Sequence, residues 1–192
     1  MSEEVFETSA PRNNPPAASW TKRLVFLILF VYLIQMLSRY LIAENWAILS
    51  WGLHPRAVTD GQWWRLISAT FLHGSLLHLG FNLLALWLLG SQIEKFLGAK
   101  FFLLLYFTSA LGGSLASTYF SPAATFSIGA SGAIFGLMGS FIIIGKKIKA
   151  DVSQIVVLLV INLVLGFTVS GIDWKAHLWG FTRRGYLYKV SC

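Results

Sequence analysis

The sequence predicts an all-α membrane protein, a polytopic bundle of six transmembrane helices. Hydrophobic residues make up 56% of the 192 residues and charged residues only 12%, and the mean hydropathy is +0.66. Several apolar runs approach the roughly 20 residues that a helix needs to cross a bilayer. Lysine and arginine gather in short clusters between these runs, as membrane topology requires. This composition excludes a soluble domain of ordinary make-up.

Charge and cysteine content exclude several other classes of protein. The net charge of +7 would suit nucleic acid, but the cations lie between apolar segments, so we expect no nucleic-acid partner. The single cysteine, Cys192, permits neither an internal disulfide nor a cysteine-based metal cluster. The metalloprotease pattern H-E-x-x-H is absent from the sequence, and we expect neither a metal nor a cofactor. An aspartyl protease of the membrane needs paired aspartates within its spans, whereas Asp60, Asp151 and Asp173 fall at segment ends.

The chain divides into a tail and a membrane domain. Residues 1–20 are expected to form a flexible cytoplasmic tail, because the stretch is polar, proline-containing and without the apolar core of a signal peptide. Residues 21–192 form the membrane domain, with a first span at about 24–42. Residues 43–75 are only half apolar and are predicted to lie at the interface, because tryptophan prefers the headgroup level. The tryptophans of this stretch are Trp46, Trp51, Trp63 and Trp64.

Five further apolar runs complete the predicted bundle. These spans are expected at about 76–93, 101–120, 128–145, 152–169 and 173–190. The positive-inside rule places the amino terminus in the cytoplasm, because most lysines and arginines then fall in inner segments. The exceptions are Arg39, Arg56, Arg65 and Lys175. This orientation places His78, Ser131 and His177 toward the outer leaflet.

A candidate nucleophile stands at the start of the fourth span, in Gly129-Ala130-Ser131-Gly132. If a helix begins near Ser131, its first backbone N–H groups have no partner within the helix and attract negative charge. A serine at that point carries part of its own oxyanion hole. Gly129 and Gly132 permit a tight turn and a close approach of another backbone. Small residues are also common where membrane helices pack, so the tetrapeptide alone is weak evidence for catalysis.

A candidate base lies in the sixth span. A serine hydroxyl needs a base to take its proton, and His177 is the residue there with a suitable ordinary pKa. Ala176 and Gly180 form a small-residue face that lets this helix approach Ser131 closely. Phe135, one turn after Ser131, either packs on the imidazole ring or is an ordinary core aromatic.

The second span carries polar side chains that lipid would not tolerate. His78 and Asn82 are four residues apart, so they share one helical face, and both can donate hydrogen bonds. They either complete an oxyanion hole or join helices and bind a buried water. We favour the oxyanion hole, because both face the half of the membrane in which Ser131 lies. His73, five residues before His78, is expected on a different helical face, which argues against a pair of metal ligands.

In this order and on these spans, the residues resemble the rhomboid family of intramembrane serine proteases, of the bacterial six-span type. The matching features are Trp64-Arg65, His73, His78-Leu79-Gly80-Phe81-Asn82, Gly129-Ala130-Ser131-Gly132, Ala176-His177 and Gly180. The resemblance implies a protein of the bacterial inner membrane that cleaves transmembrane segments of other proteins near the outer leaflet. It makes Ser131 the nucleophile and His177 the general base. It assigns His78, Asn82 and the Ser131 amide to the oxyanion hole, and gives the first loop a structural or lipid-anchoring role.

The end of the chain departs from the family's pattern. The family continues the sixth helix with a further small residue one turn after Gly180, where this sequence has Arg184. Together with Arg183 it lies near mid-membrane, where each arginine costs about 2.5–3.5 kcal/mol on insertion scales. This predicts a sixth helix that is short or inserts poorly. The alternative function is therefore an inactive rhomboid-like protein that binds transmembrane clients.

Overall fold

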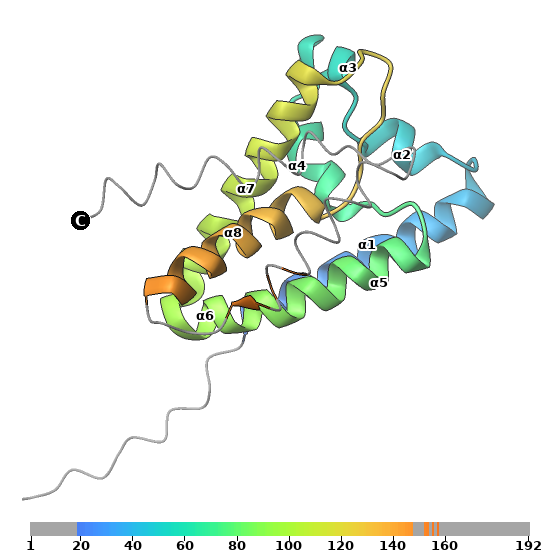
Figure 1. Ribbon diagram of the computed structural model, residues 1–192. Helices are drawn as coiled ribbons and strands as arrows, with labels where there is room; N and C mark the ends of the chain where they lie inside the picture. Colours follow the sequence, from blue (N-terminus) through green and yellow to red (C-terminus); the bar gives the residue numbers. More distant parts are fainter. Residues whose placement is uncertain (1–18, 148–151, 154, 156, 158–192) are drawn as a thin grey trace, which may run out of the picture.

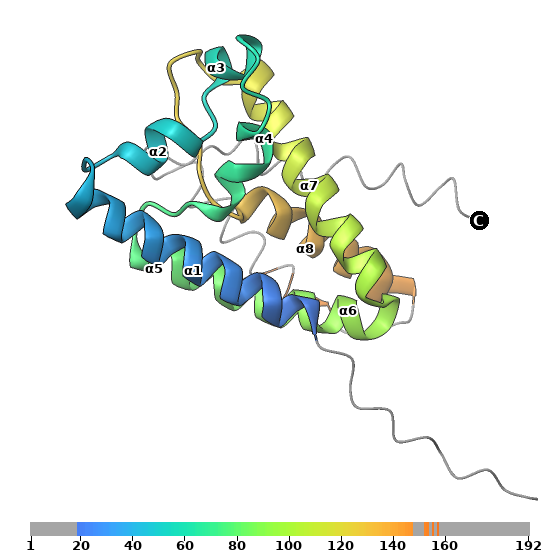
Figure 2. The same ribbon diagram turned by 180° about the vertical axis from the view of Figure 1, so that it is seen from behind.

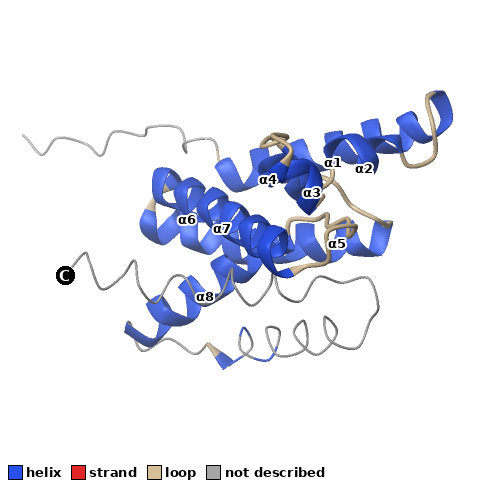
Figure 3. Cartoon of the chain, turned by 90° about the horizontal axis from the view of Figure 1, so that it is seen from above, coloured by secondary structure: helices blue, strands red, loops and turns tan. Residues whose placement is uncertain are grey.

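The fold consists of helices of very different lengths, as the sequence predicts. The computed structural model describes residues 19–147 together with residues 152, 153, 155 and 157. Across this part of the chain every regular element is helical, and an isolated antiparallel bridge joins Leu53 to Ser127 (Figure 3). The prediction of an all-α fold is confirmed.

Three helices of 22 residues are long and apolar enough to cross a membrane. They are α1 (Trp20–Leu41), α7 (Ala99–Phe120) and the continuous helix Leu76–Leu97, which comprises α5 (Leu76–Ala85), the π-helical turn η2 (Leu86–Gly90) and α6 (Ser91–Leu97). At 1.5 Å per residue each spans about 33 Å, close to the thickness of a bilayer's hydrocarbon core. The predicted first three spans overlap these helices, and the helix over the second predicted span, 76–93, continues four residues further, to Leu97.

A fourth apolar helix, α8 (Ser131–Lys147), has 17 residues and packs along α7 in the centre of the molecule (Figure 1). It overlaps the predicted fourth span, 128–145, and begins three residues later, at Ser131. Small residues on α7 let the two helices approach closely, since a Cβ added at Gly132 would lie 3.7 Å from the Gly113 Cα. The predicted spans at 152–169 and 173–190, and the predicted tail, lie outside the described residues apart from a few positions.

The predicted interfacial stretch folds into short helical pieces at one end of the bundle. They are α2 (Trp46–Trp51), α3 (Pro55–Thr59), α4 (Arg65–Ser68) and the 3-10 turn η1 (Ala69–Phe71). In Figures 1 and 2 these pieces sit beside the last turns of α1 and α7 and above the start of α8. We call this the loop end of the bundle. Trp46, Trp51, Trp63 and Trp64 are each 36–67% exposed, as expected for side chains at a lipid interface.

The apolar core lies between α1, η2, α7 and α8. Its fully buried side chains include Ile28 from α1, Leu86 and Leu89 from η2, Phe102 from α7 and Leu137 from α8. At Gly90 the helices come so close that an added Cβ would lie 3.0 Å from both Phe102 and Thr21. The start of α1 is fastened there by Glu94, whose carboxylate accepts hydrogen bonds from the side chain and backbone N–H of Thr21 at 2.7 and 3.0 Å.

Candidate active site

The turn before α8 positions Ser131. Gly129 has a φ of 118°, a conformation that side-chain-bearing residues rarely adopt, and its N–H donates to the Ala69 carbonyl at 2.9 Å. Just upstream, Ser127 and Leu53 exchange both backbone hydrogen bonds, at 2.9 and 3.0 Å. The loop end therefore holds the Gly-Ala-Ser-Gly segment by its backbone, and α8 begins at Ser131 itself.

His78 lies against this turn. A Cβ added at Gly129 would come within 2.7 Å of both Nε2 and Cε1 of the His78 ring, so only glycine fits there. The Gly74 N–H donates to His78 Nδ1 at 3.5 Å, and on that basis we assign the proton of the neutral ring to Nε2. An N–H donor thus sits against the glycine two residues before Ser131.

His73 is not part of the second span. The Ser75 side chain accepts from the His78 N–H at 3.2 Å and caps α5, so the helix begins at Leu76 and His73 lies in the preceding loop. The expectation that His73 and His78 occupy two faces of one helix is therefore wrong. Their rings meet edge to face, with 5.0 Å between centroids and 62° between planes.

The environment of His73 keeps its imidazole neutral. His73 is 0% exposed, and its Nδ1 lies 3.3 Å from the Phe71 carbonyl, to which it donates. Burial, and secondarily the neighbouring His78, lowers the pKa of His73 to about 4. Its Nε2 is buried without a hydrogen-bond partner in the described part of the chain. Over the same residues, no three His, Cys, Asp or Glu side chains gather as metal ligands would.

Asn82 and Phe135 are both buried in the bundle. Asn82 is 6% exposed, and its Nδ2 donates to the His78 carbonyl one turn earlier at 2.7 Å. That bond uses one of its two amide protons and leaves the other for a further acceptor. Phe135 is 2% exposed and belongs to the central core. His177 and Gly180, which are predicted to lie opposite Ser131, are outside the described residues.

Arg65 has a structural role at the loop end. Its guanidinium donates to the carbonyls of Gly52 at 2.7 Å and Leu49 at 2.8 Å, and to the Gln62 side chain at 2.6 Å. These bonds close the end of α2, whose last carbonyls have no partner within the helix. Burial lowers the pKa of Arg65, which still stays charged at neutral pH. Its neighbour Trp64 is 50% exposed and faces outward.

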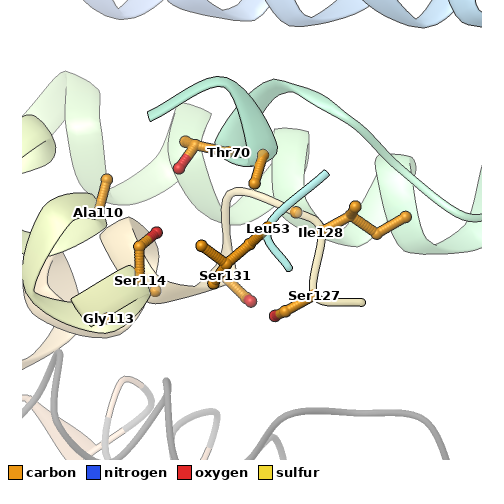
Figure 4. Close-up of a pocket in the computed structure, with 11 residues that line it drawn as sticks. Leu53, Thr70, Ala110, Gly113, Ser114, Ser127, Ile128 and Ser131 are labelled. Carbon is orange, nitrogen blue, oxygen red and sulfur yellow. The ribbon is translucent and has the colours of Figure 1, made fainter. Parts of the chain in front are cut away.

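A small cavity opens beside Ser131 (Figure 4). It lies between α7, the loop end and the turn before α8, and its volume of about 20 Å³ suits about one water molecule. Three hydroxyl side chains line it besides Ser131. They are Thr70, Ser114 and Ser127. Their positions in the sequence give no signal, because isolated hydroxyl residues are common in loops and membrane helices and carry no pattern.

Comparison with known proteins identifies the family. The family model described as Rhomboid domain matches residues 60–190. Rhomboid protease GluP of Bacillus subtilis (strain 168) is 34% identical over 188 residues, which cover 92% of this chain and 36% of GluP. Putative rhomboid protease YdcA of the same organism is 34% identical over 140 residues, 70% of each chain. RHOMBOID-like protein 5 of Arabidopsis thaliana is 38% identical over 139 residues, 68% of this chain and 44% of that protein.

The match covers α4, η1, α5 to α8 and the residues beyond, and so includes every position from Trp64 to Gly180 on which the resemblance rests. This chain spans little more than a third of the length of GluP. Helices long and apolar enough to cross a membrane agree with the family match. The protein is therefore an integral membrane protein and belongs to the rhomboid family of intramembrane proteases.

Proposed function

We propose that this chain is an intramembrane serine endopeptidase, with Ser131 as nucleophile and His177 as general base. The observation that carries the proposal is the position of Ser131 at the first turn of α8, two residues after the positive-φ Gly129, which lies against the His78 ring. A nucleophile at a helix start, beside a neutral N–H donor, is what acyl transfer through an oxyanion requires.

The reaction follows from these groups. His177 takes the Ser131 hydroxyl proton as the oxygen attacks the scissile carbonyl, and the negative charge that forms on the carbonyl oxygen needs donors. In this proposal the donors are the Ser131 backbone N–H, the His78 Nε2–H and the second amide proton of Asn82. A single donor of this kind contributes about 10²–10³-fold in rate. The leaving amine then receives the proton from His177.

The second half of the reaction needs water inside the membrane. Water hydrolyses the acyl-enzyme, and polar backbone is tolerated at membrane depth only where protein or a water-filled cavity satisfies it. The cavity beside Ser131 has room for about one water, and its hydroxyl lining offers the hydrogen bonds that such a water makes. We assign this cavity to the hydrolytic water.

The substrates in this proposal are transmembrane segments of other proteins, cut near the outer leaflet. A helix must unwind before Ser131 can reach its carbonyl, which favours segments with helix-weakening residues at their outer end and a small residue at the cleaved position. We place the amino terminus in the cytoplasm of a bacterial cell, and thus the loop end at the outer face of the inner membrane. The positive-inside rule supports this orientation.

The second candidate function is that of an inactive family member that binds transmembrane clients. It is favoured by Arg183 and Arg184, which interrupt the sixth span close to His177. A displaced His177 would leave Ser131 without its base, whereas the surfaces that hold a client helix would persist.

Labelling with a fluorophosphonate serine probe tests the proposal on the full chain in detergent. We expect the wild type to be labelled, and both Ser131→Ala and His177→Ala to lose labelling. Ser127→Ala is the matched control, because Ser127 lines the same cavity and should leave labelling intact. A folded wild type without labelling, or labelling that Ser127→Ala removes and Ser131→Ala keeps, would overturn the proposal. The first of these results would favour client binding.

A further inference from the structure

The exposed cations of the described helices are paired at one end of the bundle and unpaired at the other. At the loop end, Arg39 contacts Glu44 at 3.3 Å and Arg56 contacts Asp60 at 4.0 Å. At the opposite end, five exposed cations form no ion pair with any residue that the structure describes. We call this the basic end, and its cations are Lys22, Arg23, Lys95, Lys100 and Lys146. Figures 1 and 2 show the starts of α1 and α7 and the ends of α6 and α8 gathered there.

Glu94 is the carboxylate that the structure describes at the basic end, and it bonds to the start of α1 and not to the cations. Glu94 accepts hydrogen bonds from the Ser19 hydroxyl at 2.8 Å, the Trp20 N–H at 2.7 Å, and both the N–H and hydroxyl of Thr21 at 3.0 and 2.7 Å. Three of these donors contact Oε2 and one contacts Oε1, so both carboxylate oxygens are bonded to the start of α1. Glu94 therefore fastens the start of α1 to α6, and its bonds leave the neighbouring cations available to an external anion.

Two tryptophan rings lie next to Lys22 and Arg23, the first two cations of the basic end. Lys22 Nζ lies 5.8 Å from the centroid of the Trp87 ring, and the Arg23 guanidinium lies 4.6 Å from that of Trp20. Trp87 is 45% exposed and Trp20 is 40% exposed. Tryptophan prefers the headgroup level of a bilayer. The start of α1 therefore presents unpaired cations and tryptophan rings together, a combination typical of a surface that binds lipid headgroups.

We propose that the basic end binds the headgroup of an anionic phospholipid between α1 and η2. Lys22 and Arg23 contact the lipid phosphate, and the exposed faces of Trp87 and Leu88 border its acyl chains. A lipid is the occupant that fits, because the cations adjoin a surface that is apolar and spans the membrane. This binding does not depend on the proposed protease activity.

Native mass spectrometry of the full chain tests the proposal, with phosphatidylglycerol and phosphatidylcholine of equal chain length as competing probes. We expect the wild type to retain phosphatidylglycerol preferentially. The double variant Lys22→Gln, Arg23→Gln should weaken that binding about tenfold or more, since each cation near a lipid surface is worth about 1 kcal/mol. The matched control, Arg39→Gln with Arg56→Gln at the loop end, should keep the preference.

A second variant distinguishes a specific lipid-binding site from non-specific attraction of anionic lipids by the surface charge. Trp87→Leu keeps every cation and the apolar surface but removes the ring beneath Lys22, so a site loses affinity several-fold while a charge layer does not change. The proposal is overturned if wild type binds both lipids equally, or if either the double variant or Trp87→Leu binds phosphatidylglycerol as wild type does. It is also overturned if replacing the tail's Glu3, Glu4 and Glu7 by glutamine is needed before phosphatidylglycerol binds, because the tail is then the occupant.

Discussion

The side-chain amide of Gln35 pairs with the backbone of His73 in the way that a neighbouring strand would. Gln35 Nε2 donates to the His73 carbonyl at 2.7 Å, and the His73 N–H donates to Gln35 Oε1 at 3.1 Å. Both residues are buried, Gln35 in the last two turns of α1 and His73 in the loop before α5. One polar side chain in an apolar helix thus fastens the first span to the loop that carries His73 and leads into His78.

Gln35→Leu should destabilise the protein strongly. The substitution keeps the volume but leaves two buried backbone groups of His73 without partners, each worth about 1–3 kcal/mol. We therefore expect a loss of roughly 2–6 kcal/mol, seen as a lower thermal unfolding temperature in detergent. Gln92→Leu is the control, because Gln92 is exposed and bonds only within its own helix. Equal stability of the two variants would contradict the role assigned to Gln35.

His73 should make stability fall on mild acidification. Its pKa is about 4 in the folded protein and about 6.5 in the unfolded chain, so the unfolded state binds the proton first as pH falls. Stability is then full above about pH 6.5 and declines toward pH 4, by at most about 3 kcal/mol.

Thermal unfolding measured between pH 7 and pH 4 checks this, with His73→Asn as the comparison. Asparagine cannot titrate, so the variant should show a flatter dependence on pH even though it is less stable overall. A slope unchanged by the substitution would show that another group causes the acid sensitivity.

Arg65→Lys should be costly although it conserves the charge. Lysine is a point charge without the planar fork that reaches the Leu49 and Gly52 carbonyls and the Gln62 side chain together. We expect a loss of about 2–3 kcal/mol, because bonds from a buried charged group are left unmade. In Arg56→Lys, at an exposed ion pair, the loss should stay below about 0.5 kcal/mol. Denaturation of both proteins side by side distinguishes a structural cap from a general need for positive charge.

Gly129→Ala should abolish most probe labelling of Ser131, if the proposed function holds. The added methyl group would meet the His78 ring at 2.7 Å and force the proposed oxyanion donor away. We expect labelling to slow about 100-fold or more, the usual cost of one such donor.

Gly98→Ala is the control that separates the two effects of Gly129→Ala, backbone strain and the contact with the His78 ring. Gly98 also has a positive φ, of 81°, but nothing lies within 4 Å of an added Cβ. It therefore bears the backbone strain without a contact at the site, and we expect its labelling rate to match wild type. Comparable loss in both variants would mean that backbone strain, and not the position of His78, controls reactivity.

The lengths and positions of the first spans follow from the sequence, because apolar runs near the length of a bilayer must form helices that satisfy their own backbone. The sequence placed the fourth span at about 128–145, and the local signal for a helix start near Ser131 was the preceding glycine, which permits a tight turn. The motif residues were sufficient to indicate the rhomboid family. None of these inferences needs contacts between distant parts of the chain.

Tertiary structure alone decided how the site is held together. His78 meets Gly129 across 51 residues of chain, Gln35 meets His73 across 38, and Arg65 closes a helix that begins 19 residues earlier. Such pairings depend on how the helices pack. In the sequence, a single polar residue in an apolar run indicates that it has a polar partner but does not identify that partner. The sequence by itself therefore determined the membrane helices, the family and the candidate residues, whereas packing decided which imidazole faces the turn before Ser131 and which side chains fasten it there.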